Sequence, residues 1–278
     1  MTLTARDVGK LLATHGLRPS RALGQNFVAD PNTVRRIARL AQVHQGDNVV
    51  EIGAGLGSLT LALAETGASV IAVEADRYLL PVLEEVLSGT SVRVVHADAM
   101  TVHWHELLGD QPGWVLVANL PYNIATPLVA DLLDGAPMIT RMLVMVQREV
   151  GERLAASPST PAYGAVSVKV AYWAHASIAG RVPASVFVPR PKVESVLVSI
   201  ERRTTPAVDP VHVPAEHLFR LVRAGFAQRR KMLRRSLAGV VSLQAFETAG
   251  IPPESRAEEL GVEQWGRLAA AAVGGTGV

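Results

Sequence analysis

The chain has 278 residues, 49% of them hydrophobic, which is enough for a large packed core and favours one large and one small domain. It contains no cysteine, so disulfides, thiolate metal sites and thiol nucleophiles are excluded. The net charge is only +2, and no apolar run approaches the ~20 residues that span a bilayer. The first residues lack the pattern of a secretory signal, so we expect a cytoplasmic protein, with a monomer as the default state.

Short apolar segments alternate with helical patterns through most of the chain. Strands are expected at Asn48–Ile52, Ser69–Glu74, Val92–His96, Trp114–Ala118, Met142–Gln147, Val166–Trp173 and Val193–Ile200. Helices are expected at Asn32–Ala41, Ser58–Thr66, Arg77–Leu87, Thr126–Leu133 and Glu149–Ala156. Continuous apolar strands separated by helices indicate an α/β fold, with a mainly parallel sheet covered on both faces. The last two strands have no helix between them, which allows an antiparallel pair at one edge.

A segment rich in proline and threonine, 204–214, marks the expected linker between two domains. After it, helical patterns occur at His217–Leu237, Leu243–Ala249, Arg256–Leu260 and Glu263–Ala272. We therefore expect a large α/β domain over residues 1–203 and a small all-helical domain over residues 215–278.

The first expected strand runs into a glycine-rich turn, Gly53-Ala54-Gly55-Leu56-Gly57. Glycines between a strand and a helix let the backbone approach a ligand closely. The spacing differs from the G-x-G-x-x-G of dinucleotide enzymes. Glu51 also places an anion before the first glycine, which would repel a pyrophosphate but support an ammonium group. These features favour S-adenosylmethionine over NAD as the ligand; the alternative is a tight structural turn.

Acidic residues follow the next two expected strands. Glu74 ends its strand near the ~20-residue offset from the glycine turn at which an acid binds ribose hydroxyls in nucleotide-binding folds. Asp98 follows the third strand, where a carboxylate can accept a hydrogen bond from an adenine amino group. The alternative for Glu74 is a solvated charge at a strand end, and for Asp98 it is a helix N-cap.

The fourth expected strand is followed by Asn119-Leu120-Pro121-Tyr122. The exocyclic amine of adenine is a poor nucleophile because its lone pair is delocalised into the ring. The Asn119 side-chain carbonyl and the Leu120 backbone carbonyl can accept both amine hydrogens and make the nitrogen more pyramidal. Pro121 fixes the turn, and Tyr122 offers a face on which the base can stack. The pattern predicts methyl transfer to an exocyclic nitrogen by alignment and charge matching; the alternative is a simple turn.

With these motifs, the chain resembles the ribosomal RNA small subunit adenine dimethyltransferases of the KsgA type over nearly its whole length. The resemblance is carried by residues 23–28 (LGQNFV), 51–57 (EIGAGLG), Glu74, Asp98, 119–127 (NLPYNIATP), 147–150 (QREV), 187–195 (FVPRPKVES) and 226–231 (FAQRRK). Val28 and Ala54 depart from the leucine and proline that are usual in this family. Neither departure removes a polar contact.

The resemblance implies a Rossmann-like class I methyltransferase with a seven-stranded, mainly parallel sheet. Such enzymes transfer two methyl groups from S-adenosylmethionine to N6 of each of two adjacent adenosines, in a hairpin loop near the 3′ end of 16S rRNA, during 30S subunit biogenesis. S-adenosylhomocysteine is the product, and no metal is implied. The implied cofactor contacts are Gln25, Asn26, Val28, Glu51, Gly53, Gly55, Glu74, Asp98, Ala99 and Asn119. The target base is implied to meet Asn119, Leu120, Pro121 and Tyr122, with Phe187 stacking on its other face.

Basic residues are concentrated late in the chain: between residues 181 and 240, twelve arginines and lysines accompany four acids. Such a local field suits a polyanionic partner. The side chains expected to contact RNA phosphates are Arg223, Arg229, Arg230, Lys231, Arg234 and Arg235. The alternative is a solvated helix face.

Two other functions stay open from the sequence. One is methylation of adenine in 23S rRNA, as performed by resistance enzymes of the same superfamily. The other is a non-catalytic small-subunit assembly factor that keeps the fold. The intact Asn119-Leu120-Pro121-Tyr122 segment argues against a loss of activity.

Overall fold

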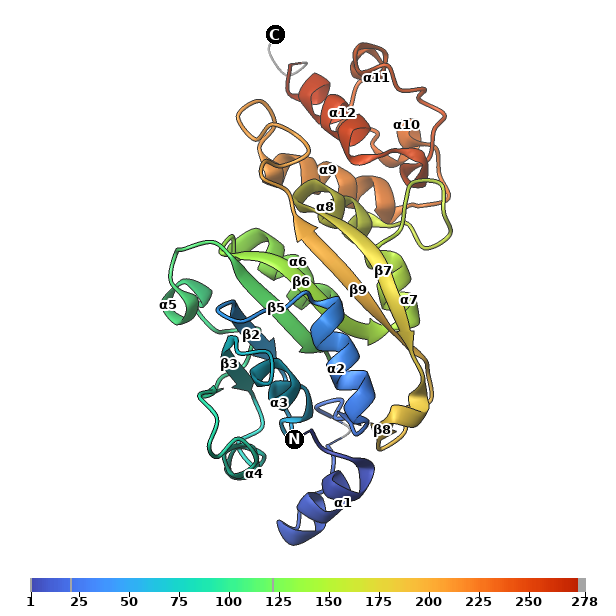
Figure 1. Cartoon of the computed structure of the whole chain (residues 1–278). Coiled ribbons are helices and arrows are strands. Elements are labelled where there is room, and N and C mark those ends of the chain that lie inside the picture. The colour runs from blue at the N-terminus through green and yellow to red at the C-terminus, as the bar shows by residue number, and fades with distance from the viewer. Residues whose placement is uncertain (1, 21, 122, 275–278) are drawn as a thin grey trace. The chain divides into compact units, whose positions relative to one another are not determined.

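The computed structural model describes residues 2–20, 22–121 and 123–274. Its larger sheet has seven strands in the order β4-β3-β2-β5-β6-β9-β7 (Figure 1). The strands are β2 (Asn48–Ile52), β3 (Ser69–Glu74), β4 (Arg93–His96), β5 (Trp114–Asn119), β6 (Ile139–Gln147), β7 (Ala174–Val182) and β9 (Ser195–Arg202). Neighbours from β4 to β6 pair in parallel, whereas β9 runs antiparallel to β6. The expected α/β fold with a mainly parallel sheet is confirmed.

Helices cover both faces of this sheet (Figure 1). On one face, α2 (Pro31–Leu40) and α3 (Ser58–Ala64) share a buried cluster with strand residues such as Val49 and Val115. On the other face lies α6 (Ala125–Gly135). Burial on both faces explains why the strands are continuously apolar.

Further elements accompany the seven-stranded sheet. They are α1 (Ala5–Thr14), α4 (Leu80–Val86), α5 (Trp104–Leu108), α7 (Arg148–Leu154), η1 (Ala184–Val186) and a small antiparallel sheet of β1 (Phe27–Val28) and β8 (Phe187–Val188).

The segment expected as a sixth strand, Val166–Trp173, is instead helix α8 (Ala165–Trp173), so that prediction is wrong. Val168, Val170 and Tyr172 are all buried, which leaves no clear helical stripe, and period alone does not separate a buried helix from a buried strand. The edge strand is the following segment, β7. Most of its residues are exposed or half-buried in no regular alternation, so it carries little strand signal.

The chain divides into two compact units, the first formed by 1–151 with 177–202 and the second by 152–176 with 203–278. The second unit contains α8, α9 (Ala215–Ala227), α10 (Leu233–Ser236), α11 (Leu243–Ala249), η2 (Ala257–Glu259) and α12 (Val262–Gly274). This division differs from the expected boundary at residue 203, because segment 152–176 belongs with the C-terminal helices. The reason is packing: Tyr163 and Tyr172 are buried in one cluster with Phe219 and Trp265, and the Tyr163 hydroxyl donates to the Leu260 carbonyl at 2.9 Å.

The expected continuous helix over His217–Leu237 is also wrong. Helix α9 ends at Ala227, and α10 begins only at Leu233. Met232 forms a β-bridge with Arg256, and the Leu233 N–H donates to the Ser255 carbonyl at 2.7 Å. Because these backbone groups bond to a distant segment, the i→i−4 hydrogen bonds of a helix cannot continue through them.

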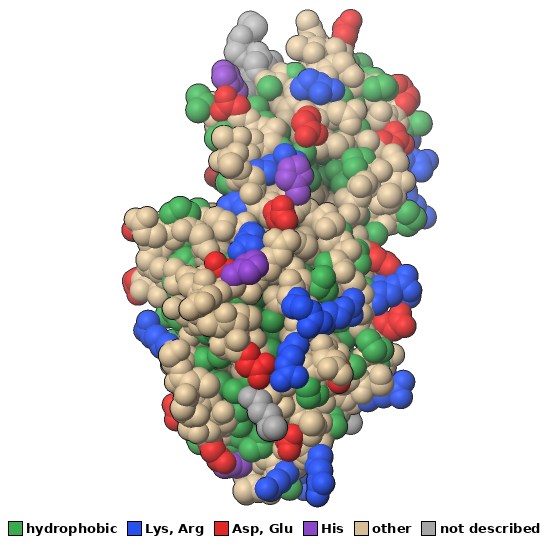
Figure 2. Space-filling view, in the orientation of Figure 1, with side chains coloured by type: hydrophobic (Ala, Val, Ile, Leu, Met, Phe, Trp, Pro, Cys, Tyr) green, Lys and Arg blue, Asp and Glu red, His purple; other side chains and the backbone are tan. Residues whose placement is uncertain are grey.

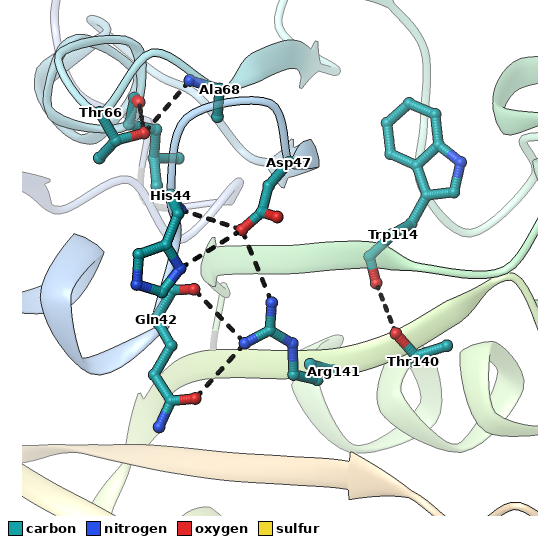
Figure 3. Close-up of polar contacts among 9 residues, drawn as sticks. Gln42, His44, Asp47, Thr66, Ala68, Trp114, Thr140 and Arg141 are labelled. Atoms are coloured by element: carbon teal, nitrogen blue, oxygen red, sulfur yellow. Dashed lines mark hydrogen bonds and ion pairs between the residues drawn. The ribbon is translucent and has the colours of Figure 1, made fainter.

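Figure 3 shows how the connection between α2 and β2 is tied to the start of β6. Arg141 Nη1 donates to the Gln42 carbonyl at 3.4 Å, and its Nη2 lies 3.7 Å from Asp47 Oδ2. The same Asp47 oxygen accepts the His44 N–H at 2.9 Å. Arg141 therefore fixes the path of the chain as it leaves α2 and enters the sheet.

Arg202, at the end of β9, donates to four backbone carbonyls. Its Nε bonds to Ile139 at 3.0 Å, its Nη1 to Leu133 at 2.9 Å, and its Nη2 to Leu132 at 3.0 Å and Ala136 at 3.3 Å. Three of these carbonyls lie at or just beyond the end of α6, where few backbone donors remain for the last carbonyls of a helix. One half-buried guanidinium thus joins β9, β6 and α6.

We expect Arg202→Met to lower the free energy of unfolding by about 2–4 kcal/mol, because the substitution removes four hydrogen bonds from a charged donor inside the protein. Urea denaturation of the full chain measures this. The control is Glu201→Gln, an exposed position on the same strand, which should change the free energy by less than about 0.5 kcal/mol. Equal midpoints for Arg202→Met and the wild type would contradict the assigned role.

Within the described ranges, no helix combines the length and apolarity needed to cross a membrane.

Candidate active site

A pocket of about 270 Å³ opens in the first unit, at the carboxyl ends of β2, β3 and β5. Ligands of open α/β sheets bind at this edge. The predicted cofactor contacts that line it are Gln25, Asn26, Gly53, Gly55, Glu74, Asp98, Ala99 and Asn119. The other two, Val28 and Glu51, line a smaller cavity that shares Gly53, Gly55 and Asn119 with the pocket. The fold therefore gathers the predicted contacts in one place.

The glycine turn after β2 forms one wall of the pocket. Gly53, Gly55 and Gly57 have φ angles of 75°, 58° and 85°, a left-handed conformation that favours glycine. A Cβ on Gly55 would lie 3.0 Å from the Phe27 ring, so the turn is packed closely against β1. The turn thus needs glycine both for its backbone shape and for space.

The Glu74 carboxylate ties the ends of two strands together. Its Oε2 accepts the Gly55 N–H at 2.7 Å and its Oε1 accepts the Asp76 N–H at 2.8 Å. Burial raises the pKa of Glu74, and these backbone donors oppose the rise. A carboxylate oxygen can accept more than one hydrogen bond, so Glu74 can also bind the hydroxyl groups of a ligand in the pocket.

Glu51, on β2, is 1% exposed. Burial raises the pKa of its carboxyl to about 8; the Thr60 hydroxyl opposes the rise, and the charge of Glu74 adds to it. Oε2 of Glu51 has no hydrogen-bond partner among the described residues. A buried acid that has one unpartnered oxygen and lines a cavity is suited to receive a cationic group.

Asn119 ends β5 and is held from across the pocket. Its Nδ2 donates to the Asn26 carbonyl at 2.9 Å, a contact between residues 93 positions apart. With the amide nitrogen engaged in this way, Oδ1 is the group left to accept a hydrogen bond. Asn119 thus combines a fixed orientation with an acceptor at the pocket wall.

Backbone hydrogen bonds fix the path of Leu120 and Pro121, the two residues that follow Asn119. The Leu120 N–H donates to the Met145 carbonyl at 3.0 Å, and the Leu120 side chain is buried. The described residues place no donor on the Leu120 carbonyl. Pro121 lines the pocket, and its carbonyl accepts from Ile124 and Ala125 at the start of α6. Tyr122, expected to stack on the base, lies outside the described residues.

The segment before β1 closes the pocket from the other side. Gln25 Nε2 donates to Asp76 Oδ2 at 2.7 Å, and Gln25 Oε1 accepts the Ser20 N–H at 2.7 Å. Asn26 donates through Nδ2 to the Gly24 carbonyl at 3.0 Å. Gln25 therefore acts within the protein, joining this segment to the turn after β3, in addition to lining the pocket.

Asp98 follows β4 and shapes its own turn. Its Oδ1 accepts the Met100 N–H at 2.9 Å, and its backbone carbonyl accepts from Thr101 and Val102. Asp98 Oδ2 forms no hydrogen bond among the described residues. Asp98 and its neighbour Ala99 both line the pocket.

Phe187 does not take the position expected for it. Its side chain is 3% exposed and belongs to the buried cluster beneath α2 and α3. The cause is the pairing of β8 with β1, in which Phe187 lies opposite Val28 and is held in the core. This corrects the expectation that Phe187 stacks on the target base.

Sequence reasoning missed the apolar lining of the pocket: Leu23, Phe27, Val73, Leu79, Met100 and Ile124. Leu23 is 44% exposed and Met100 is 37% exposed, so both present apolar surface to the open pocket. Leu23 belongs to the motif at residues 23–28, but the motif alone does not show which of its side chains line the pocket; Met100 has no local signal that separates it from a core residue. Among the described residues, no cluster of three or more histidine or acidic side chains is arranged to hold a metal ion.

The predicted RNA-binding residues all lie in the second unit and are exposed. Two of them are partly engaged: Arg229 bonds to Glu258 and to the Pro161 carbonyl, and Arg234 lies 3.1 Å from Glu254. The other four, Arg223, Arg230, Lys231 and Arg235, form no ion pair within the described part of the chain. They are available to bind an anion.

The sheet has seven strands, and β9 runs antiparallel to its neighbour β6. Together with a pocket next to a glycine turn, this arrangement defines the class I Rossmann-like methyltransferases. A family model described as ribosomal RNA adenine dimethylase matches residues 17–272. The chain belongs to this family of methyltransferases.

Individual relatives agree with this assignment. The chain is 48% identical over 283 residues to the ribosomal RNA small subunit methyltransferase A of Kineococcus radiotolerans, covering 98% of this chain and 92% of the relative. The solved structure of the 23S rRNA methyltransferase ErmE matches with a TM-score of 0.71 and 25% identity, over 89% of this chain and all of that one. A dimethyladenosine transferase from Plasmodium falciparum matches with a TM-score of 0.75 over 87% of this chain and 95% of that one; at 23% identity it supports the fold alone.

Proposed function

We propose that this protein transfers methyl groups from S-adenosylmethionine to N6 of two adjacent adenosines in a hairpin loop near the 3′ end of 16S rRNA, within the 30S subunit. We further propose that it acts as a monomer in the cytoplasm. The observation that carries the chemistry is Asn119: its amide nitrogen is bound to Asn26, and its oxygen is left as an acceptor at the pocket wall. The relative from Kineococcus radiotolerans, which acts on the small subunit, supports the substrate.

The pocket offers a group for each part of the proposed cofactor. Glu51 would hold the ammonium end next to the glycine turn, and Glu74 would accept the ribose hydroxyls. Asp98 would accept the adenine amino group, with the Ala99 backbone beside it. Apolar residues such as Met100 and Leu79 would contact the faces of the adenine ring. When bound, the cofactor supplies an electrophilic methyl group on a sulfonium.

At the target base, the chain's own groups align and activate the nitrogen. Oδ1 of Asn119 and the Leu120 carbonyl would accept the two amine hydrogens, which draws the lone pair out of the ring. Pro121 supplies no N–H that could compete for these acceptors, and its carbonyl is already bonded to α6. Once methylated, the nitrogen is acidic enough to release its proton to water, so the site needs no strong general base. A loop adenosine suits this site because an unpaired base is easily moved into a pocket.

The exposed cations Arg223, Arg230, Lys231 and Arg235 would contact phosphates of the same RNA. Methylation of 23S rRNA is the second candidate, because the ErmE structure shares the fold at a TM-score of 0.71. The much higher identity to a small-subunit enzyme favours 16S rRNA.

The test is methyl transfer from labelled S-adenosylmethionine to small subunits that lack the modification, with large subunits and naked rRNA assayed in parallel. Mass spectrometry of the nucleosides identifies the product. N6,N6-dimethyladenosine from small-subunit RNA alone is the expected result. Label in large-subunit RNA would support the second candidate. Binding of cofactor and subunit without any transfer would reject both and leave an assembly factor.

A further inference from the structure

Helix α2 carries three arginines, Arg35, Arg36 and Arg39, and Arg141 reaches the end of this helix from β6. These four residues are called the arginine ridge. Figure 2 shows Lys and Arg side chains gathered over α2. The apolar side of α2 is buried against the sheet, so the ridge lies on the side that faces solvent.

Only two of the four arginines of the ridge, Arg35 and Arg141, lie next to an acidic side chain in the part of the chain that the structure describes. Arg35 Nε lies 3.0 Å from Glu65, and Arg141 Nη2 lies 3.7 Å from Asp47. Arg36 and Arg39 form no ion pair among the described residues. Arg36 and Arg39 lie three positions apart on the helix, and like charges at this spacing mildly destabilise it, so an anion bound between them would stabilise the helix.

Arg36 is held in a fixed orientation. Its Nη1 donates to the Arg181 carbonyl on β7 at 3.0 Å. Gly180 makes this possible, because a Cβ at that position would collide with the Arg36 guanidinium. A guanidinium has five N–H donors, so most of them stay available, and its planar shape suits the oxygens of a phosphate. The ridge thus contains a pre-oriented phosphate donor.

The ridge starts close to the pocket. Asn26 lines the pocket, and α2 begins five residues later at Pro31. At about 1.5 Å of rise per residue, Arg36 and Arg39 stand about 8 Å and about 12 Å along the helix from Pro31. The ridge therefore lies on the helix that directly follows the pocket-lining segment, and an RNA whose target base enters the pocket could extend along it.

We propose that the arginine ridge binds the phosphate backbone of the RNA stem that adjoins the target loop. It is a second RNA contact, in the first unit, separate from the basic residues of the second unit. The inference rests on the proposed function in one respect only, that the substrate is RNA. Phosphate contacts of this kind position the substrate and carry no sequence information.

The test compares the salt dependence of binding to deproteinised small-subunit RNA for three double variants of the full chain. Arg36→Gln with Arg39→Gln should lower the slope of log K against log salt by about 1.4–1.8, and lower affinity at about 0.1 M salt by at least tenfold. Arg36→Lys with Arg39→Lys keeps the charges and should retain most of the slope. Lys10→Gln with Arg93→Gln changes the net charge equally at exposed positions on α1 and β4 and should bind like the wild type.

An unchanged slope in the Arg36→Gln, Arg39→Gln variant would overturn the proposal, and so would an equal loss in the Lys10→Gln, Arg93→Gln control. Calorimetry with S-adenosylmethionine shows whether each variant keeps the wild-type pocket. Methyl transfer by the wild type tests the proposed function separately, because the salt slope can be measured whether or not a methyl group moves.

Discussion

Replacing Asn119 by alanine is expected to lower the rate of methyl transfer to adenosine by roughly 100- to 1,000-fold. The substitution removes the oxygen that we assign to one amine hydrogen, an interaction that strengthens as the nitrogen becomes pyramidal in the transition state. It also removes the hydrogen bond that joins β5 to the Asn26 carbonyl. The binding of S-adenosylmethionine should weaken less, by about tenfold or below, because Glu51, Glu74 and Asp98 stay in place.

Single-turnover transfer to small subunits measures the rate, and calorimetry measures cofactor binding. Asn119→Asp keeps an acceptor oxygen but loses the donor to Asn26, so its rate should lie between those of the wild type and Asn119→Ala. Asn32→Ala makes the same chemical change at an exposed position on α2 and should leave the rate unchanged. If Asn119→Ala keeps more than about one tenth of the wild-type rate, the acceptor role is wrong.

The second large effect that we expect is a dependence of cofactor affinity on pH, which follows from the proposed contact between Glu51 and the cofactor. Burial raises the pKa of this carboxyl to about 8, so it is mostly protonated at neutral pH in the free protein. Pairing with the ammonium group of S-adenosylmethionine requires the charged form, so binding releases a proton. Affinity should therefore rise with pH, by up to about tenfold per pH unit below pH 8, and level off above it.

Calorimetry between pH 6 and 9, in buffers of different ionisation enthalpy, measures both affinity and proton release. In the Glu51→Gln variant, the affinity for S-adenosylmethionine should no longer vary with pH, and the proton release that Glu51 contributes should be lost. Glu65→Gln, which removes an exposed carboxylate on the same unit, is the matched control. A wild-type profile that is already flat would contradict the assignment of Glu51 to the ammonium group.

The same pKa predicts how the stability of the free protein varies with pH. Between its ordinary value of 4.5 and about 8, the native state holds a proton on Glu51 that the unfolded state has lost. The stabilisation from this proton is complete below pH 4.5 and disappears as pH rises to about 8, at no more than about 1.4 kcal/mol per pH unit. Glu74, whose pKa burial also raises, acts in the same direction, so Glu51→Gln should remove only part of the slope.

Local patterns were sufficient where an element is defined by its own residues. β2 (Asn48–Ile52), β3 (Ser69–Glu74) and α11 (Leu243–Ala249) have the predicted bounds. The two strands are short apolar runs that end at a glycine or an acid, and α11 lies between Ser242 as its N-cap and Gly250 in left-handed conformation. Signals of this kind need no distant partner.

Elements defined by their surroundings were predicted less well. Segment 165–173 is apolar on several sides, and only its packing among the C-terminal helices makes it α8. The helix expected through Gln228 is broken because Met232 and Leu233 bond to Ser255 and Arg256. Such through-space hydrogen bonds override helix propensity, and their partners cannot be identified from local sequence.

The sequence by itself determined the class of protein and many of the residues that line its pocket, because glycines, acids and Asn119 at the ends of parallel strands must meet at one edge of the sheet. Only the tertiary structure decided how these groups are used. In the structure, Asn119 donates a hydrogen bond to the Asn26 carbonyl, and Arg36 donates one to the Arg181 carbonyl on β7. The pairing of β8 with β1 buries Phe187 in the core. Each of these contacts joins residues far apart in the chain, so it depends on how the layers pack.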